Sequence, residues 1–174
     1  MIRYGRKGLA AMAAVVVAGC AAPGAPLDEQ RRLVAAPLDG RSVIVADGAS
    51  PNVVELNGSR IVRLWESGPP PVALDYGGDV GAEAGNAYRE GFAGTGFYVA
   101  DIPPGSDLDD IPMHAQDSLD YIAVLHGEID LVMPDTVRRM RQGDVLVQLG
   151  TEHSWVNPTE SWCRLLVVVV TGER

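Results

Sequence analysis

The chain has 174 residues, of which 47% are hydrophobic, and its formal net charge is −9. This length predicts one domain with an additional arm, and the hydrophobic content is sufficient for a single core. The acidic balance and the lack of a basic patch argue against nucleic acid as a partner.

Residues 1–19 have the organisation of a signal peptide, with a basic start and an apolar stretch at 9–17 that is too short to span a bilayer. The segment closes with Val-Ala-Gly-Cys, which resembles a bacterial lipobox. We therefore predict that Cys20 is lipidated and becomes the N-terminus of the mature protein. A plain signal peptide cut near Ala22 is the alternative. The lipoprotein prediction implies a protein of the bacterial cell envelope, held on the extracytoplasmic side of a membrane by its lipid alone.

Lysine and cysteine usage restricts the chemistry of the mature chain. Lys7 is the only lysine and leaves with the signal peptide, which excludes a Schiff base on the protein's own lysine. Once Cys20 carries a thioether, Cys163 has no partner for a disulfide within the chain. We expect Cys163 to be a buried structural thiol.

Residues 20–37 are predicted to form a tether, in which residues 28–34 make a short helix. The tether is small and punctuated by proline, so residues 20–36 are expected to be dispensable for folding. Residues 38–100 follow as an N-terminal arm with strand character and an Asn57-Gly58 hairpin turn. We expect the arm to extend the barrel or to pair with a neighbouring subunit in a homodimer.

A glycine-rich insertion at 67–96 interrupts the strand periodicity of the arm. A loop of this length is either functional or disordered. It could cover the mouth of a barrel as a lid, but a mobile surface insertion is the favoured interpretation. The aspartate run at 107–110 lacks the glycine and distal glutamate of a calcium loop, and it is predicted to be a solvated turn.

Residues 101–174 are predicted to form the core of an all-β barrel, because short β-rich runs alternate with turn signals and helix patterns are almost absent. His126 falls at a break before Gly127, where its ring is expected to lie outside the barrel. Arg138, Arg139 and Arg141 are predicted to form a solvated edge.

The chain's three histidines all lie in the window 114–157. His114, Gln116 and Asp120 differ by even numbers, so an extended strand projects them from one face. His153, Trp155 and Asn157 repeat this arrangement on a second strand. Two such strands can converge inside a barrel, which predicts a site there.

The same window resembles the two signature motifs of the cupin superfamily. The first motif is represented by His114, Gln116, Asp120 and Gly127, and the second by Gly143-Asp144 and His153 to Asn157. The similarity is greatest to small single-domain cupins, and it implies a double-stranded β-helix (jelly-roll) barrel. The sequence departs from the usual pattern in having Gln116 for the second histidine and Asp120 for the glutamate.

Two imidazoles and one carboxylate form the ligand set of a 2-His-1-carboxylate centre. His114, Asp120 and His153 are therefore predicted to hold a divalent metal (iron, manganese, nickel or zinc), with Gln116 as a further oxygen ligand. Trp155 and Asn157 are predicted to line the substrate pocket. The alternative is that both histidines are core polar residues bonded to Asp120 and Asn157, and a metal-free pair could still perform acid–base chemistry.

The expected function is that of a metal-dependent enzyme that dehydrates, isomerises, decarboxylates or oxygenates a small molecule in the barrel, with His114, Asp120 and His153 as its catalytic residues. The resemblance supports this class of protein without selecting the reaction. A non-enzymatic lipoprotein that binds or senses a small molecule is the alternative. An envelope protein with a vestigial site is a third interpretation.

Overall fold

The computed structural model describes residues 24–75 and 78–173. The predicted signal peptide at 1–19 and the predicted lipid attachment residue Cys20 lie outside these ranges. No helix in these ranges is long enough and apolar enough to cross a membrane.

Antiparallel strands make up almost all of the regular structure in the described ranges. Three sheets form, with strand orders β1-β2, β10-β7-β8 and β3-β4-β5-β11-β6-β9. The elements are β1 (Arg31–Leu38), β2 (Arg41–Ala49), β3 (Val53–Leu56), β4 (Ser59–Ser67), the 3₁₀ helix η1 (Val80–Glu83), β5 (Thr95–Ile102), β6 (Ser118–His126), β7 (Glu128–Met133), β8 (Thr136–Arg141), β9 (Val145–Leu149), β10 (Ser154–Val156) and β11 (Cys163–Thr171).

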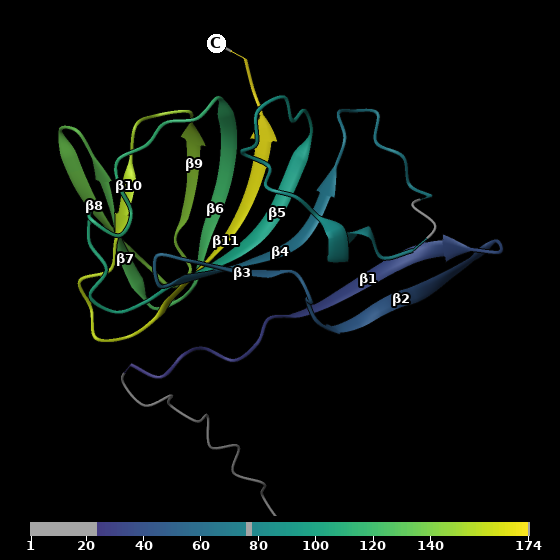
Figure 1. Ribbon diagram of the computed structural model, residues 1–174, viewed down its shortest axis with the longest axis horizontal. Coiled ribbons are helices and arrows are strands. Elements are labelled where there is room, and N and C mark those ends of the chain that lie inside the picture. Colours follow the sequence, from purple (N-terminus) through teal and green to yellow (C-terminus); the bar gives the residue numbers. More distant parts are fainter. Residues whose placement is uncertain (1–23, 76–77, 174) are drawn as a thin grey trace, which may run out of the picture.

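The six-stranded and three-stranded sheets face each other and form the barrel (Figure 1). Alternate residues of each strand point inward, so Ile122 of β6 and Leu165 of β11 meet Ile129 of β7 and Trp155 of β10 in one core. Tyr121, beside Ile122 in sequence, is exposed. The predicted all-β jelly-roll barrel is confirmed. His126 lies exposed at the end of β6, as expected.

The predicted helix at 28–34 is wrong, because the chain forms strand β1 from Arg31 onward. β1 pairs with β2 along its whole length, and this ladder supplies the backbone hydrogen bonds that a helix would otherwise make internally. The β1–β2 hairpin projects away from the barrel in Figure 1. The predicted Asn57-Gly58 hairpin is formed by β3 and β4, and it extends the six-stranded sheet. Pairing of the arm with a neighbouring subunit stays a prediction.

The described part of the predicted tether is hydrogen-bonded to the barrel, and its dispensability for folding stays a prediction. Asp101 is fully buried on the outer face of the large sheet and binds the guanidinium groups of Arg60 and Arg164 at 2.6 Å each. The same two arginines donate to the backbone oxygens of Leu27 (2.9 Å) and Asp28 (2.7 Å). A buried ionic cluster therefore fastens the N-terminal segment to the sheet.

The described part of the glycine-rich segment 67–96 is also packed, which argues against the mobile-insertion interpretation. Asp79 accepts a hydrogen bond from the Gly81 amide at the start of η1, and it forms an ion pair with Arg32 of β1 at 2.5 Å. Further along, the phenol oxygen of Tyr98 on β5 accepts a hydrogen bond of 2.6 Å from the buried Ala87 amide. These contacts hold the segment against the barrel.

Candidate functional site

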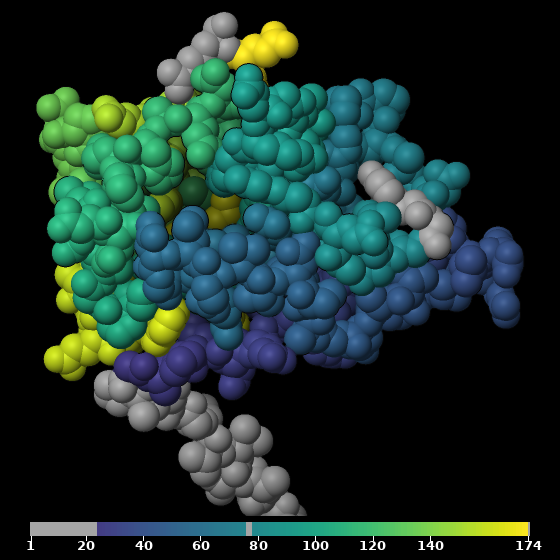
Figure 2. Space-filling view, viewed as in Figure 1, coloured from purple at the N-terminus to yellow at the C-terminus, as the bar shows by residue number. Residues whose placement is uncertain are grey.

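A cavity of about 500 Å³ opens between the two sheets on the concave face of the six-stranded sheet. Figure 2 shows the molecule hollowed between the blue β3–β4 segment and the green residues that precede β6, with yellow atoms on its floor. The residues around the cavity are mostly apolar. The polar and charged ones are Asn57, Ser59, Arg63, Asn86, Asp110, His114, Gln116, Asp120 and His153, with Tyr88, Tyr98 and Trp155 as the aromatic walls.

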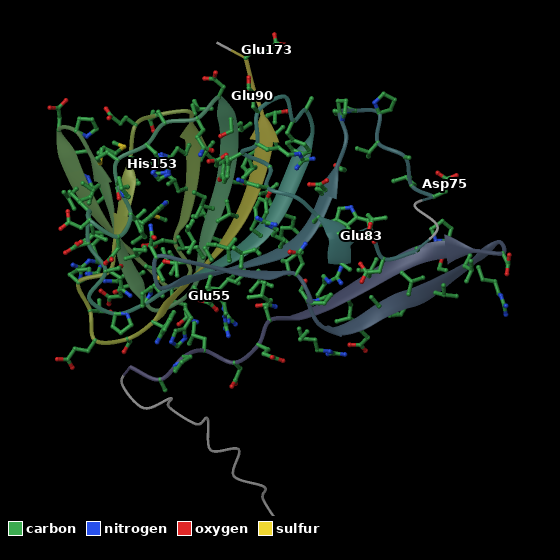
Figure 3. All side chains as sticks on the ribbon, in the orientation of Figure 1. Glu55, Asp75, Glu83, Glu90, His153 and Glu173 are labelled. Carbon is green, nitrogen blue, oxygen red and sulfur yellow. The ribbon has the colours of Figure 1, made fainter. Side chains whose placement is uncertain are left out.

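His114 and His153 are brought together by an isolated β-bridge. Each backbone amide donates to the other residue's carbonyl at 2.8 Å, and the ring centroids lie 4.4 Å apart. In Figure 3, His153 lies beside β10, at the interior of the barrel. The predicted convergence of the two histidines is confirmed. The expectation that His114 and Asp120 share one regular strand is wrong, because β6 begins only at Ser118.

Backbone carbonyls fix the orientation of both imidazole rings. Nδ1 of His114 lies 2.9 Å from the Pro112 oxygen, and Nδ1 of His153 lies 2.9 Å from the Thr151 oxygen. Since a carbonyl only accepts hydrogen bonds, each Nδ1 carries the proton in the neutral ring. Nε2 of each ring is then unprotonated. Burial lowers the pKa of His153, opposed by its bond to Thr151 and assisted by the charge of His114, and this favours the neutral ring.

Asp120 brings a buried carboxylate to the same cavity from β6. It is 6% exposed, and its Oδ1 has no hydrogen-bond partner among the described residues. Burial raises the pKa of Asp120 above its ordinary value, although a hydrogen bond from Ser118 and the charge of His114 act in the opposite direction. This carboxyl therefore holds a proton more readily than one in water.

The predicted metal ligands agree with a divalent ion in kind but not in placement. Two imidazoles with unprotonated Nε2 atoms and a carboxylate with an unpartnered oxygen are suitable donors. Within 24–75 and 78–173, however, no three His, Cys, Asp or Glu side chains are gathered closely enough to hold a metal ion. Gln116, the further predicted ligand, does line the cavity.

Of the two predicted pocket residues, only Trp155 lines the cavity. Its ring meets that of His153 edge-on, with the centroids 5.9 Å apart. Asn157 is fully buried, and its amide nitrogen donates to the carbonyls of Ile102 (3.2 Å) and Ser161 (2.9 Å). Its predicted role in the pocket is therefore wrong. It braces the chain between β10 and β11 by donating to both carbonyls, and the Thr159 hydroxyl also donates to the Ser161 oxygen at 3.0 Å.

Sequence reasoning missed Arg63, Asn86 and Tyr88, which also line the cavity. Tyr88 stacks on Tyr98 with the ring centroids 6.4 Å apart. Although 41% of Tyr88 remains accessible, burial of its phenol and the nearby Asp120 carboxylate raise the pKa of Tyr88. No local signal in the glycine-rich segment indicates this, because long-range contacts to Tyr98 place Tyr88. The alternation of residues 60–66 could have indicated Arg63, because it assigns each side chain to one face of a strand.

Comparisons with known proteins agree with this fold. No family model matches the chain. It is 39% identical over 82 residues to phomopsin biosynthesis cluster protein C' of Diaporthe leptostromiformis, an alignment covering 46% of this chain and 42% of that protein. It is 28% identical over 128 residues to a cupin-domain-containing oxidoreductase of Aspergillus ruber, covering 70% and 60% respectively. The chain thus spans about half the length of these curated relatives.

Among solved structures, the chain is similar to the cupin domain of Cnp3 from Schizosaccharomyces pombe. The TM-score is 0.51 at 16% identity, with 83% of this chain and 89% of that domain covered. At this level of identity the likeness concerns the fold alone, and the described residues have the cupin fold.

Proposed function

We propose that this chain is an enzyme that converts a small molecule in its barrel cavity, with His153 and Asp120 transferring protons. One observation carries the proposal. The His114 and His153 rings lie side by side at the cavity, and backbone carbonyls occupy both Nδ1 positions. An imidazole pair held in this way directs its basic nitrogens away from the backbone.

The opposite pKa shifts of the two buried groups suit them to complementary roles. A neutral His153 accepts a proton at Nε2, and Asp120 in its protonated form donates one. Trp155 and the apolar walls reduce the access of water to the substrate, which strengthens both interactions. His114 orients the pair through the bridge to His153.

The names of relatives support an enzyme over a non-enzymatic binding protein. Proteins of Aspergillus ruber, Neurospora crassa and Hypocrea virens that match this chain are each named a cupin-domain-containing oxidoreductase. An oxidation or reduction of a small organic molecule is accordingly one of the reaction classes, but it needs a redox partner such as a bound metal, because proton transfer by His153 and Asp120 moves no electrons.

A divalent metal is the second candidate for the chemistry of the site. The hydrogen bonds to both Nδ1 atoms favour it, because metal-binding histidines are oriented in this manner. His114 and His153 would hold the ion, with Asp120 and Gln116 as further oxygen donors. When bound, such an ion supplies Lewis acidity and redox or hydroxide chemistry that the side chains lack.

Turnover can be tested without knowing the substrate. A small-molecule extract from the source organism is incubated with the wild-type protein, the double variant His114→Ala/His153→Ala and the control His126→Ala, and it is then compared by mass spectrometry. We expect at least one compound to be consumed by the wild type and by the control, but not by the double variant. A compound that binds stoichiometrically and remains unchanged would support the non-enzymatic alternative instead.

Metal analysis of the same proteins tests the second candidate. His114→Ala and His153→Ala should each lose most of the bound ion, whereas His126→Ala should retain it. Gln116→His should tighten binding. Affinity should weaken as the pH falls through about 6.5, because the imidazoles must be unprotonated. If neither the purified nor the metal-reconstituted wild type holds an ion, the metal candidate is wrong.

A further inference from the structure

Strand β4 carries two arginines in different environments. Arg60 lies on the outer face, where it pairs with buried Asp101 at 2.6 Å. Arg63 is three positions along and, because side chains alternate, lies on the opposite, concave face with Ile61. Its position is fixed by pairing with Tyr98 on β5. One strand therefore turns one arginine outward, to a carboxylate, and the other into the cavity.

Arg63 is half-buried and forms no ion pair with any acidic side chain in 24–75 or 78–173. Glu66 is already bound to Arg89 at 2.9 Å and to the Gly85 amide at 2.8 Å. Burial opposes ionisation of Glu66, but these two hydrogen bonds and the Arg89 charge lower its pKa, with Arg63 as the smallest contributor. In a chain with a net charge of −9, a cavity-facing cation without an acidic partner is unusual. A half-buried charge of this kind is costly unless an opposite charge compensates it.

Two carboxylates line the cavity, Asp110 and Asp120, and neither forms an ion pair with Arg63. Asp110 instead accepts a hydrogen bond from the Asp107 amide at 3.2 Å. Arg63 is on β4 and Asp120 on β6, and strands β5 and β11 lie between them. Three strand spacings correspond to about 14 Å along the sheet. The cavity thus has a cationic wall at β4 and a wall with Asp120 and the histidine bridge at the other side.

We infer that the substrate of this site carries a carboxylate, which Arg63 binds while the reactive part of the molecule reaches His153 and Asp120. This inference rests on the proposed function. A monoanion is favoured over a phosphate dianion because Arg63 is a single cation among mainly apolar walls. The planar guanidinium also matches a carboxylate through two parallel hydrogen bonds. A cavity of about 500 Å³ accommodates an organic acid of one or two rings.

Binding of matched probes to the full mature protein tests the inference by calorimetry at low salt. The probes are 2-naphthoate, its neutral counterpart 2-naphthamide, and 2-naphthyl phosphate. We expect the wild type to bind the carboxylate at least about tenfold more tightly than the amide, because one charge-assisted hydrogen bond contributes about this factor to the affinity. Arg63→Met should remove this preference, and Arg63→Lys, which keeps the charge but not the planar fork, should retain part of it. Arg41→Met, at an exposed arginine of β2, should leave it unchanged.

The outcomes separate the two proposals. If carboxylate and amide bind equally, or if Arg63→Met keeps the preference, the carboxylate anchor is wrong and the cavity remains a small-molecule site. Tighter binding of the phosphate than of the carboxylate would overturn the carboxylate assignment. Failure of all three probes to bind would contradict the proposed small-molecule function itself.

Discussion

Asp120 combines burial with an incomplete set of hydrogen bonds, so its ionised form destabilises the folded protein. Its folded pKa is raised, so between the unfolded and folded pKa values the folded state binds more protons. Stability therefore falls as the pH rises through this interval. We expect Asp120→Asn to raise the melting temperature at neutral pH, with the gain vanishing below about pH 4. An equal gain at every pH would contradict this explanation.

His153 has the opposite dependence on pH. Its folded pKa is lowered, so the unfolded state binds more protons between the folded value and about 6.5, and its contribution to stability increases as the pH rises through this interval. Burial of both groups therefore costs stability, that of Asp120 at neutral pH and that of His153 at acid pH, which is typical of functional sites.

The sequence predicts those residues of the site whose position follows from short-range patterns. The two histidines, Asp120 and Trp155 were identified because their spacing fits strands and cupin motifs. Asn157 was misassigned, since spacing gives the face of a strand but not the carbonyls of Ile102 and Ser161 that its amide meets. Tyr88 was not predicted, because only tertiary contacts bring it to the cavity.

At the scale of elements, the ionic cluster around Asp101 joins β4, β5 and β11 and holds the N-terminal segment. Removing one member of a buried ion cluster leaves uncompensated charge, which typically costs 3–5 kcal/mol, so Asp101→Asn should lower the free energy of unfolding by about that amount. Denaturant titration measures the change. The exposed pair Arg31–Asp47 provides a control, Asp47→Asn, for which we expect no measurable loss. Comparable effects in both variants would argue against the cluster.

The hydroxyl of Tyr98 makes the hydrogen bond between β5 and the glycine-rich segment, beside the stacking of Tyr88 on its ring. Tyr98→Phe leaves the buried Ala87 amide without its acceptor, at a cost of about 1–3 kcal/mol. Hydrogen exchange should then accelerate at residues 85–89, and Tyr88 should lose its fixed place in the cavity. Tyr121→Phe, at an exposed position of β6, is the matched control. Unchanged exchange in Tyr98→Phe would show that other contacts position the segment.

The strands of the barrel were predictable because alternation and turn residues act locally. Strand β1 could not be predicted in this way, and neither could the packing of segment 67–96. Both depend on partners distant in sequence, such as Asp79 for Arg32 and Tyr98 for Ala87. A short polar segment such as 28–34 has weak intrinsic preference, so the available sheet partner decides its conformation.

At the scale of the whole molecule, attachment to a membrane stays a prediction that rests on the first 20 residues. Cys20→Ser should block labelling by a lipid precursor and release the protein from the membrane fraction, because the acidic chain offers no other attraction to an anionic surface. Ala22→Ser, which preserves the cysteine, serves as the control. Labelling that persists in Cys20→Ser would contradict the lipoprotein assignment.

The central claim concerns the state of the histidine pair, on which both the acid–base and the metal proposals depend. Nitrogen-15 NMR of imidazole-labelled protein at mildly alkaline pH gives the tautomer of each neutral ring directly. We predict that His114 and His153 are protonated at Nδ1, with unprotonated Nε2 atoms, whereas exposed His126 shows the mixture of a solvated imidazole. Protonation at Nε2 in both His114 and His153 would contradict the account.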